Sequence, residues 1–208
     1  MKHGLFITFE GPDGSGKSTH AEKLKQWFKN KGFSVILTRE PGGTRLAESI
    51  RKLLLNSENS VSPITELLLY AASRAQHTQE LILPSLKQGK IIISDRYYDS
   101  TVAYQHYGRG LDLKTIKELN TIASGGLTPD LTILIDLETK KSLGRLKNTR
   151  KKDRIENENT AFHRKIRNGY LALAKNEPRR IKIVKSNNEM SATFESILSV
   201  VKDFIKKQ

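Results

Sequence analysis

The chain carries the stretch Gly11-Pro12-Asp13-Gly14-Ser15-Gly16-Lys17-Ser18-Thr19, which fits the phosphate-binding pattern G-x-x-x-x-G-K-[ST]. An apolar, β-rich segment precedes it at residues 4–9, and residues 20–28 after it have helical spacing. Such a loop requires the order strand, glycine-rich turn and helix. The alternative is an ordinary glycine-rich turn, which the full pattern with both flanking elements disfavours.

The chemistry of phosphate binding explains the spacing of this stretch. Glycines let the backbone curl so that successive N–H groups point at phosphate oxygens, and the following helix adds its positive N-terminal end. Lys17 can then reach the β- and γ-phosphates while the Ser18 hydroxyl binds Mg²⁺. We therefore predict that residues 11–19 bind a nucleoside triphosphate.

The composition limits the kind of protein this can be. A chain of 208 residues suits one domain, and we expect a single domain over residues 1–208. The absence of cysteine excludes disulfides and thiolate metal sites. No apolar run has the length of a signal peptide or a membrane span, so we expect a cytoplasmic protein with no membrane partner.

A net charge of +14 invites the hypothesis of nucleic-acid binding. Lysine-rich solvated helices give the same total, and small phosphorylated substrates also favour positive charge. The chain lacks the aromatic-interleaved basic motifs of an RNA-binding module. We therefore expect no specific nucleic-acid partner.

Further strand patterns alternate with helical ones along the chain. Strands are expected at residues 33–38, 90–96, 131–136 and 180–184, and helices at 46–56, 65–88 and 192–207. This alternation predicts an α/β fold, a five-stranded parallel sheet in three layers with helices on both faces.

The strand expected at residues 90–96 ends in the charged pair Asp95 and Arg96. Ligands bind at the carboxyl ends of parallel strands, so Asp95 is placed to bind Mg²⁺ and Arg96 to face the same phosphates. The next segment concentrates polar side chains that could line a base and sugar pocket: Ser100, Thr101, Tyr104, Gln105 and Arg109.

Other residues each allow two interpretations. Spacing alone favours a solvent-exposed Arg51, although in a cleft its guanidinium would hold a phosphate bidentately. Tyr70 and Arg74 share a helix face, and spacing alone favours a core tyrosine and a surface arginine over a base-stacking ring and a base-reading guanidinium. Residues 141–154 carry seven basic side chains and one acidic one, which suits a solvated loop or a mobile lid that closes on phosphates.

With these pieces placed, the chain resembles the bacterial thymidylate kinases of the P-loop nucleoside-monophosphate kinase group. The matching motifs lie in family order at residues 9–19, 38–44, 72–76, 94–97, 100–105 and 153–156. The resemblance implies a P-loop NTPase fold, a basic lid at about residues 141–156, and transfer of the γ-phosphoryl group of ATP to dTMP with Mg²⁺. It also suggests a homodimer.

The resemblance implies a role for each acceptor-side residue. Asp13 matches the carboxylate that takes the sugar 3′-hydroxyl and helps to organise the metal shell, and Tyr104 matches the ring set against the 2′-position. The remaining dTMP-binding residues are Tyr70, which would stack on thymine, Arg74 and Thr101, which would bond its edge, Gln105 close by, and Arg51 and Arg96, which would hold the acceptor phosphate.

The resemblance also bears on catalysis. Lys17 would hold the donor phosphates, and Gly14 resembles the bacterial kind of loop, in which the catalytic arginine comes from the lid. Its candidates are Arg145, Arg150 and Arg154, with Arg150 first. The expected catalytic set is Lys17, Arg96, Arg150, Arg154 and Asp13. Three alternatives stay open: a kinase of another monophosphate, a P-loop ATPase coupled to nucleic-acid or protein binding, and a nucleotide-binding module without turnover.

Overall fold

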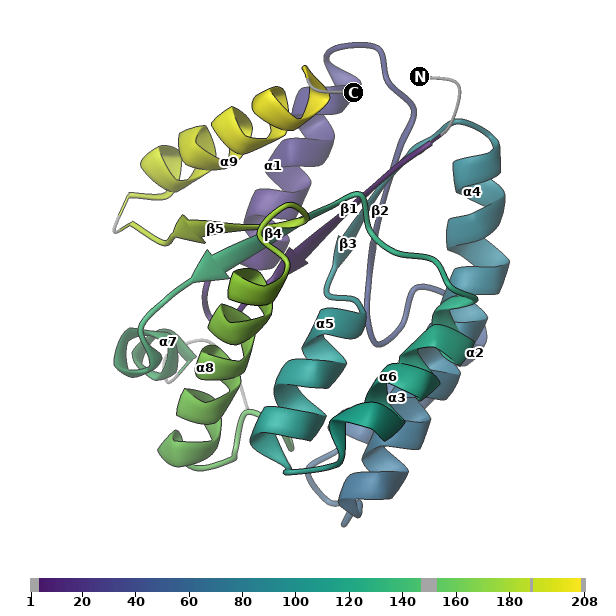
Figure 1. Cartoon of the computed structure of the whole chain (residues 1–208), viewed down its shortest axis with the longest axis vertical. Coiled ribbons are helices and arrows are strands. Elements are labelled where there is room, and N and C mark those ends of the chain that lie inside the picture. Colours follow the sequence, from purple (N-terminus) through teal and green to yellow (C-terminus); the bar gives the residue numbers. More distant parts are fainter. Residues whose placement is uncertain (1–3, 147–152, 188, 207–208) are drawn as a thin grey trace.

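A computed structural model describes residues 4–146, 153–187 and 189–206. Five parallel strands form one sheet in the order β2-β3-β1-β4-β5 (Figure 1). Their bounds are β1 Leu5–Glu10, β2 Val35–Arg39, β3 Ile91–Asp95, β4 Leu131–Asp136 and β5 Ile181–Lys185. Each lies within two residues of a predicted strand, and the predicted α/β fold is confirmed.

Helices connect the strands, and more of them exist than the sequence predicted. The expected helix at residues 65–88 runs as α3, a π-helical turn η1, and α4. The full set comprises α1 Lys17–Lys29, α2 Arg45–Leu55, α3 Pro63–His77, η1 Thr78–Ile82, α4 Leu83–Lys87, α5 Tyr98–Thr101, η2 Val102–Gly108, α6 Leu113–Ser124, α7 Thr139–Leu146, α8 Thr160–Asn176 and α9 Met190–Ile205. Helices α5, α6, α7 and α8 and the segment η2 were not predicted. The first part of the expected lid, residues 141–146, belongs to α7, and two of its residues, Ser142 and Leu146, are buried.

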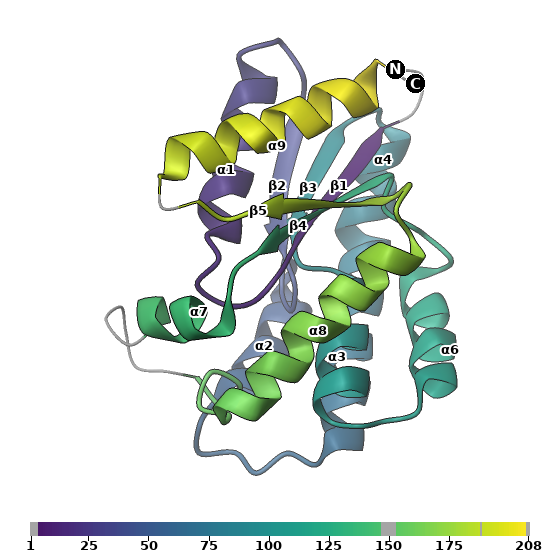
Figure 2. The ribbon, with the colours of Figure 1, turned by 60° about the vertical axis from the view of Figure 1, so that its left-hand side comes forward.

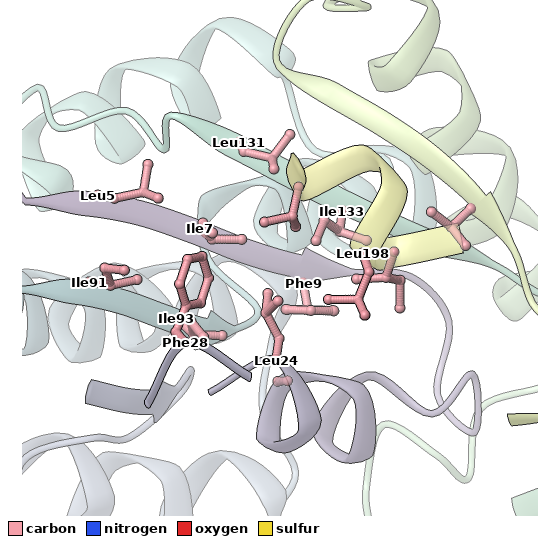
Figure 3. Packing of buried hydrophobic residues seen from close by; sticks show 14 of the residues in the cluster. Leu5, Ile7, Phe9, Leu24, Phe28, Ile91, Ile93, Leu131, Ile133 and Leu198 are labelled. Carbon is pink, nitrogen blue, oxygen red and sulfur yellow. The ribbon is translucent and has the colours of Figure 1, made fainter. Parts of the chain in front are cut away.

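The two faces of the sheet carry different helices. Helices α1 and α9 cover one face, and the others lie toward the opposite face or beyond the ends of the strands (Figures 1 and 2). Side chains alternate along a strand, so Leu5, Ile7 and Phe9 of β1 point to the α1 side and join its apolar core. Figure 3 shows these side chains packed with residues of α1, β3, β4 and α9.

The same alternation decides which charged residues meet. Glu10 shares its face with Phe6 and therefore points away from α1. Asp95 shares its face with Ile91 and Ile93, toward the start of α1. The end of the sheet thus presents carboxylates to both sides.

Within the described part of the chain, no helix combines the length and apolar character needed to cross a membrane.

Candidate active site

A cleft of about 420 Å³ opens at the carboxyl ends of β1 and β3, which suits a small-molecule site. Its walls come from the loop after β1, helices α2 and α3, and the segment α5–η2. Fourteen predicted site residues line it: Asp13, Gly14, Gly16, Lys17, Ser18, Thr19, Arg51, Tyr70, Arg74, Asp95, Arg96, Thr101, Tyr104 and Gln105. Gly11, Pro12 and Ser15 complete the loop behind this lining.

The loop of residues 11–19 has the geometry of an anion cradle. Gly11 adopts a φ of 137°, and a Cβ on it would lie 2.3 Å from the Ile135 carbonyl oxygen, so only glycine fits. Helix α1 begins after Gly16 with no side-chain cap, which leaves its first N–H groups for a ligand. Lys17 Nζ donates to the carbonyls of Gly11 at 3.0 Å and Pro12 at 2.9 Å. Burial lowers the pKa of Lys17 to about 8.

A hydroxyl and a carboxylate meet beside this loop. Ser18, on the first turn of α1, donates its hydroxyl hydrogen to the carboxylate of Asp95 at the end of β3. Both line the cleft. Hard oxygen donors of this kind suit Mg²⁺.

Arg96 is the centre of a hydrogen-bonded cluster that includes the phosphate loop, since its Nη1 donates to the Gly11 carbonyl at 3.1 Å. Its Nη2 donates to Asp13 Oδ1 at 2.5 Å and to the Tyr104 hydroxyl at 3.1 Å, and that hydroxyl donates to Asp13 Oδ2 at 2.8 Å. Burial alone would raise the pKa of Asp13, but the charges of Arg96 and Lys17 outweigh it and hold the pKa well below its usual range. Burial raises the pKa of Tyr104, so its phenol stays protonated as a donor.

Glu10 backs this cluster from the sheet. Its carboxylate accepts from the Tyr97 backbone N–H at 2.8 Å, the Ser100 hydroxyl at 2.6 Å and the Tyr170 hydroxyl at 3.0 Å. Tyr170 also accepts from Arg96 Nη1 at 2.8 Å. Burial and the charge of Asp99 raise the pKa of Glu10 to about 7, although Arg96 opposes the rise.

Arg74 is buried, so the surface position that spacing alone favoured for it is wrong. Only 1 % of it is exposed. Its Nε donates to Glu40 Oε2 at 2.8 Å and its Nη1 to Asn120 Oδ1 at 2.9 Å. A buried guanidinium requires such a carboxylate partner, and His77 Nδ1 lies 3.0 Å from the other Glu40 oxygen.

Thr101 and Arg51 offer polar atoms to the same part of the cleft. The Thr101 Oγ1 is buried without a hydrogen-bond partner among the described residues, which marks it as available to a ligand. Arg51 is half-buried rather than fully solvent-exposed, and its Nη1 donates to the Pro41 carbonyl at 2.8 Å.

The three lid arginines have different positions. Arg150 lies outside the described residues. Arg145 Nη1 donates to the Gly14 carbonyl at 3.2 Å, at the edge of the phosphate loop. Arg154 does not line the cleft: its Nε donates to the Leu54 carbonyl at 2.9 Å and its Nη1 pairs with Glu66 at 2.7 Å. Two nitrogens of the Arg154 guanidinium are thus engaged in the protein, while its Nη2 is buried without a hydrogen-bond partner among the described residues. The catalytic role of Arg154 stays a prediction.

Sequence analysis assigned no role to several residues that hold the site together: Glu10, Glu40, Glu66, Asn120 and Tyr170. For two of them, the position in the sequence could have indicated a place in the site. Glu10 directly follows the strand predicted at residues 4–9, and Glu66 precedes Tyr70 by one helical turn. Asn120 lies on α6 and Tyr170 on α8. They reach the site only because α6 packs against α3 and α8 against η2, which nothing in their local sequence indicates.

Comparison with known proteins adds a family to this geometry. The family model described as "Thymidylate kinase" matches residues 9–197. A thymidylate kinase of Caldanaerobacter subterraneus is 43% identical over 203 residues, which cover 98% of this chain and 97% of that protein. One of Geotalea daltonii is 48% identical, covering 95% and 96%. The crystal structure of the Ehrlichia chaffeensis thymidylate kinase superposes with a TM-score of 0.79 at 35% identity, covering 96% of this chain and 98% of that one.

Proposed function

The chain belongs to the thymidylate kinase family and is an ATP-dependent dTMP kinase that forms dTDP; on that premise we propose that the cleft described above is where the phosphoryl group is transferred. The observation that carries the proposal is that one cavity holds two cationic groups. Lys17 belongs to the phosphate loop and Arg51 to helix α2, and both line the cleft with Arg96. Arg96, after β3, also contacts the loop through the Gly11 carbonyl and Asp13. A nucleoside triphosphate and a nucleoside monophosphate need one such site each.

On the donor side, residues 11–19 hold the ATP phosphates. Lys17 exchanges its present carbonyl partners for β- and γ-phosphate oxygens, which are stronger acceptors for an ammonium group. Ser18 and Asp95 would hold Mg²⁺, since the Ser18 hydroxyl and the Asp95 carboxylate are hydrogen-bonded to each other and both are hard oxygen ligands. The metal would neutralise charge on the transferring phosphate.

On the acceptor side, Arg51 and Arg96 hold the dTMP phosphate. Tyr70 stacks on the base, Arg74 and Thr101 bond its edge, and Gln105 lies close by. Asp13 takes the 3′-hydroxyl, and the Tyr104 ring leaves no room for a 2′-hydroxyl. This assignment is supported by the common lining of one cleft and by the unpartnered Thr101 hydroxyl.

The chemistry requires little of the protein beyond alignment and charge neutralisation. The acceptor phosphate is already an anionic nucleophile, so no strong general base is needed. A lid cation would neutralise charge as the phosphoryl group moves. Arg150 remains our first candidate, and Arg145, which already contacts the phosphate loop, and Arg154 are the others.

A dinucleoside polyphosphate that joins adenosine to thymidine tests the two-site cleft. We expect it to compete with both ATP and dTMP and to bind more tightly than either substrate, because one molecule would fill both sites. Competition with only one substrate would contradict a common cleft.

We also propose that the chain acts as a single domain in the cytoplasm, where its substrates occur, and as a homodimer. The dimer proposal is supported by four large apolar side chains that are about half exposed on the paired helices α2 and α3: Leu46, Leu53, Ile64 and Leu68. Light scattering should give twice the monomer mass, and Leu68→Glu should reduce it to the monomer mass.

A further inference from the structure

Glu66 joins two parts of the molecule that the proposed mechanism treats separately. It is fully buried on α3 and accepts hydrogen bonds at both carboxylate oxygens. Oε1 accepts from Gln105 Nε2 at 2.8 Å and Arg109 Nε at 3.1 Å. Oε2 accepts from Arg109 Nη2 at 3.1 Å and pairs with Arg154 Nη1 at 2.7 Å.

The hydrogen bond between Gln105 and Glu66 determines which atom of the Gln105 amide can bond to a base. Burial alone would raise the pKa of Glu66, but hydrogen bonds from Arg109 and Gln105 outweigh it and keep the pKa below its ordinary value. Glu66 is therefore an ionised group that can only accept, so Gln105 must turn its NH₂ group toward it. The amide oxygen is left as an acceptor for another partner. Thymine offers an N–H at N3, whereas cytosine has a lone pair there.

The bond to Arg154 reaches the turn of residues 153–156, which we call the lid-base turn. Arg154 is also held there by its own backbone, whose N–H donates to the Leu55 carbonyl at 3.2 Å. Its neighbours Asp153 and Ile155 line the cleft, as does Leu55. One carboxylate thus holds Gln105 and the turn whose residues Asp153 and Ile155 line the same cleft.

We propose that Glu66 is a positioning residue that fixes the Gln105 amide to accept from the N3–H of the acceptor base and, through Arg154, holds the lid-base turn against α2. The proposal rests on the proposed function, since it requires the base to lie near Gln105. It makes selection against cytosine depend on a residue that touches no substrate.

Glu66→Gln tests the first half, because a neutral amide can also donate and no longer dictates the orientation of Gln105. We expect the KM for dTMP to rise about tenfold while the KM for ATP changes less than twofold. We also expect the affinity for dCMP, measured as a competing ligand, to rise about tenfold relative to the affinity for dTMP. Glu158→Gln is the matched control, since Glu158 pairs with Arg109 but with neither Gln105 nor Arg154; it should leave all three values unchanged.

Arg154→Met tests the second half and guards against a Glu66 variant that fails to fold. It leaves Glu66 with Arg109 and Gln105, so the preference for dTMP over dCMP should persist. Backbone amides of residues 153–158 should exchange with solvent at least about tenfold faster, because the side-chain anchor of the turn is lost.

Unchanged base preference in Glu66→Gln, equal effects in the Glu158→Gln control, or unchanged exchange in Arg154→Met would each overturn the proposal. Failure of the proposed function would instead show in the unmodified protein, as dTMP that does not bind in the cleft.

Discussion

Replacing Glu10 by glutamine should change how the stability of the protein depends on pH. In the folded protein, burial and the charge of Asp99 raise the pKa of Glu10 from 4.5 to about 7. Because the folded-state pKa lies above the unfolded one, the contribution of Glu10 to stability is fully present below pH 4.5 and is lost as pH rises through 7. A change of this size corresponds to about 3 kcal/mol in total, most of which falls between pH 5 and pH 8.

The assay is urea unfolding of both proteins at pH 5, 6, 7 and 8, with the difference in unfolding free energy taken at each pH so that other titrating groups cancel. We expect the difference to shift toward the glutamine variant by about 2 to 3 kcal/mol over this range. Glu66→Gln is the control: the folded-state pKa of Glu66 is lowered, so its contribution is lost only as pH falls below about 4.5 and its difference should stay nearly flat. A flat profile for Glu10→Gln, or one that favours the native protein as pH rises, would refute the reasoning.

Four further variants test the cleft. Lys17→Ala should lower turnover by several orders of magnitude in a steady-state assay, and a loss of only a few-fold would count against the assignment. In the unmodified protein, Lys17 has a pKa of about 8 and loses its charge above that pH. Calorimetry should therefore find weaker ATP binding above pH 8. Arg74→Ala should chiefly raise the KM for dTMP, and a loss of turnover alone would contradict its base-reading role. Tyr104→Phe should cost about 2 kcal/mol of unfolding free energy, since Asp13 and Arg96 each lose a hydrogen bond, yet keep the preference for deoxyribonucleotides. Tyr104→Ala should lose that preference, and retention of it would exclude the ring as the cause.

The strands and the phosphate loop could be predicted because their signals are local. Residues 11–19 carry a complete pattern, and β-branched runs such as residues 91–93 identify buried strands wherever they occur. The charged end of β3 followed from one rule, that ligands bind at the carboxyl ends of parallel strands. The same rule would have identified Glu10.

The partners of these residues could not be predicted, because they come from distant parts of the chain. Arg74 is buried only because Glu40 and Asn120, 34 and 46 residues away in sequence, supply its acceptors. Arg154 lies in a basic run that suggests solvent, yet Glu66 draws it into the protein. Helical spacing identifies the buried face of α3, but it does not say which charges the rest of the fold will bring to that face.

The most direct measurement is ADP release from Mg-ATP in the presence of dTMP, dUMP, dGMP, UMP or no acceptor, with the product identified. Phosphoryl transfer between two sites of one cleft predicts strong dependence on dTMP, dTDP as the product, and little ADP without an acceptor. ATP hydrolysis that is independent of any monophosphate, particularly if DNA or RNA increased it, would contradict the account.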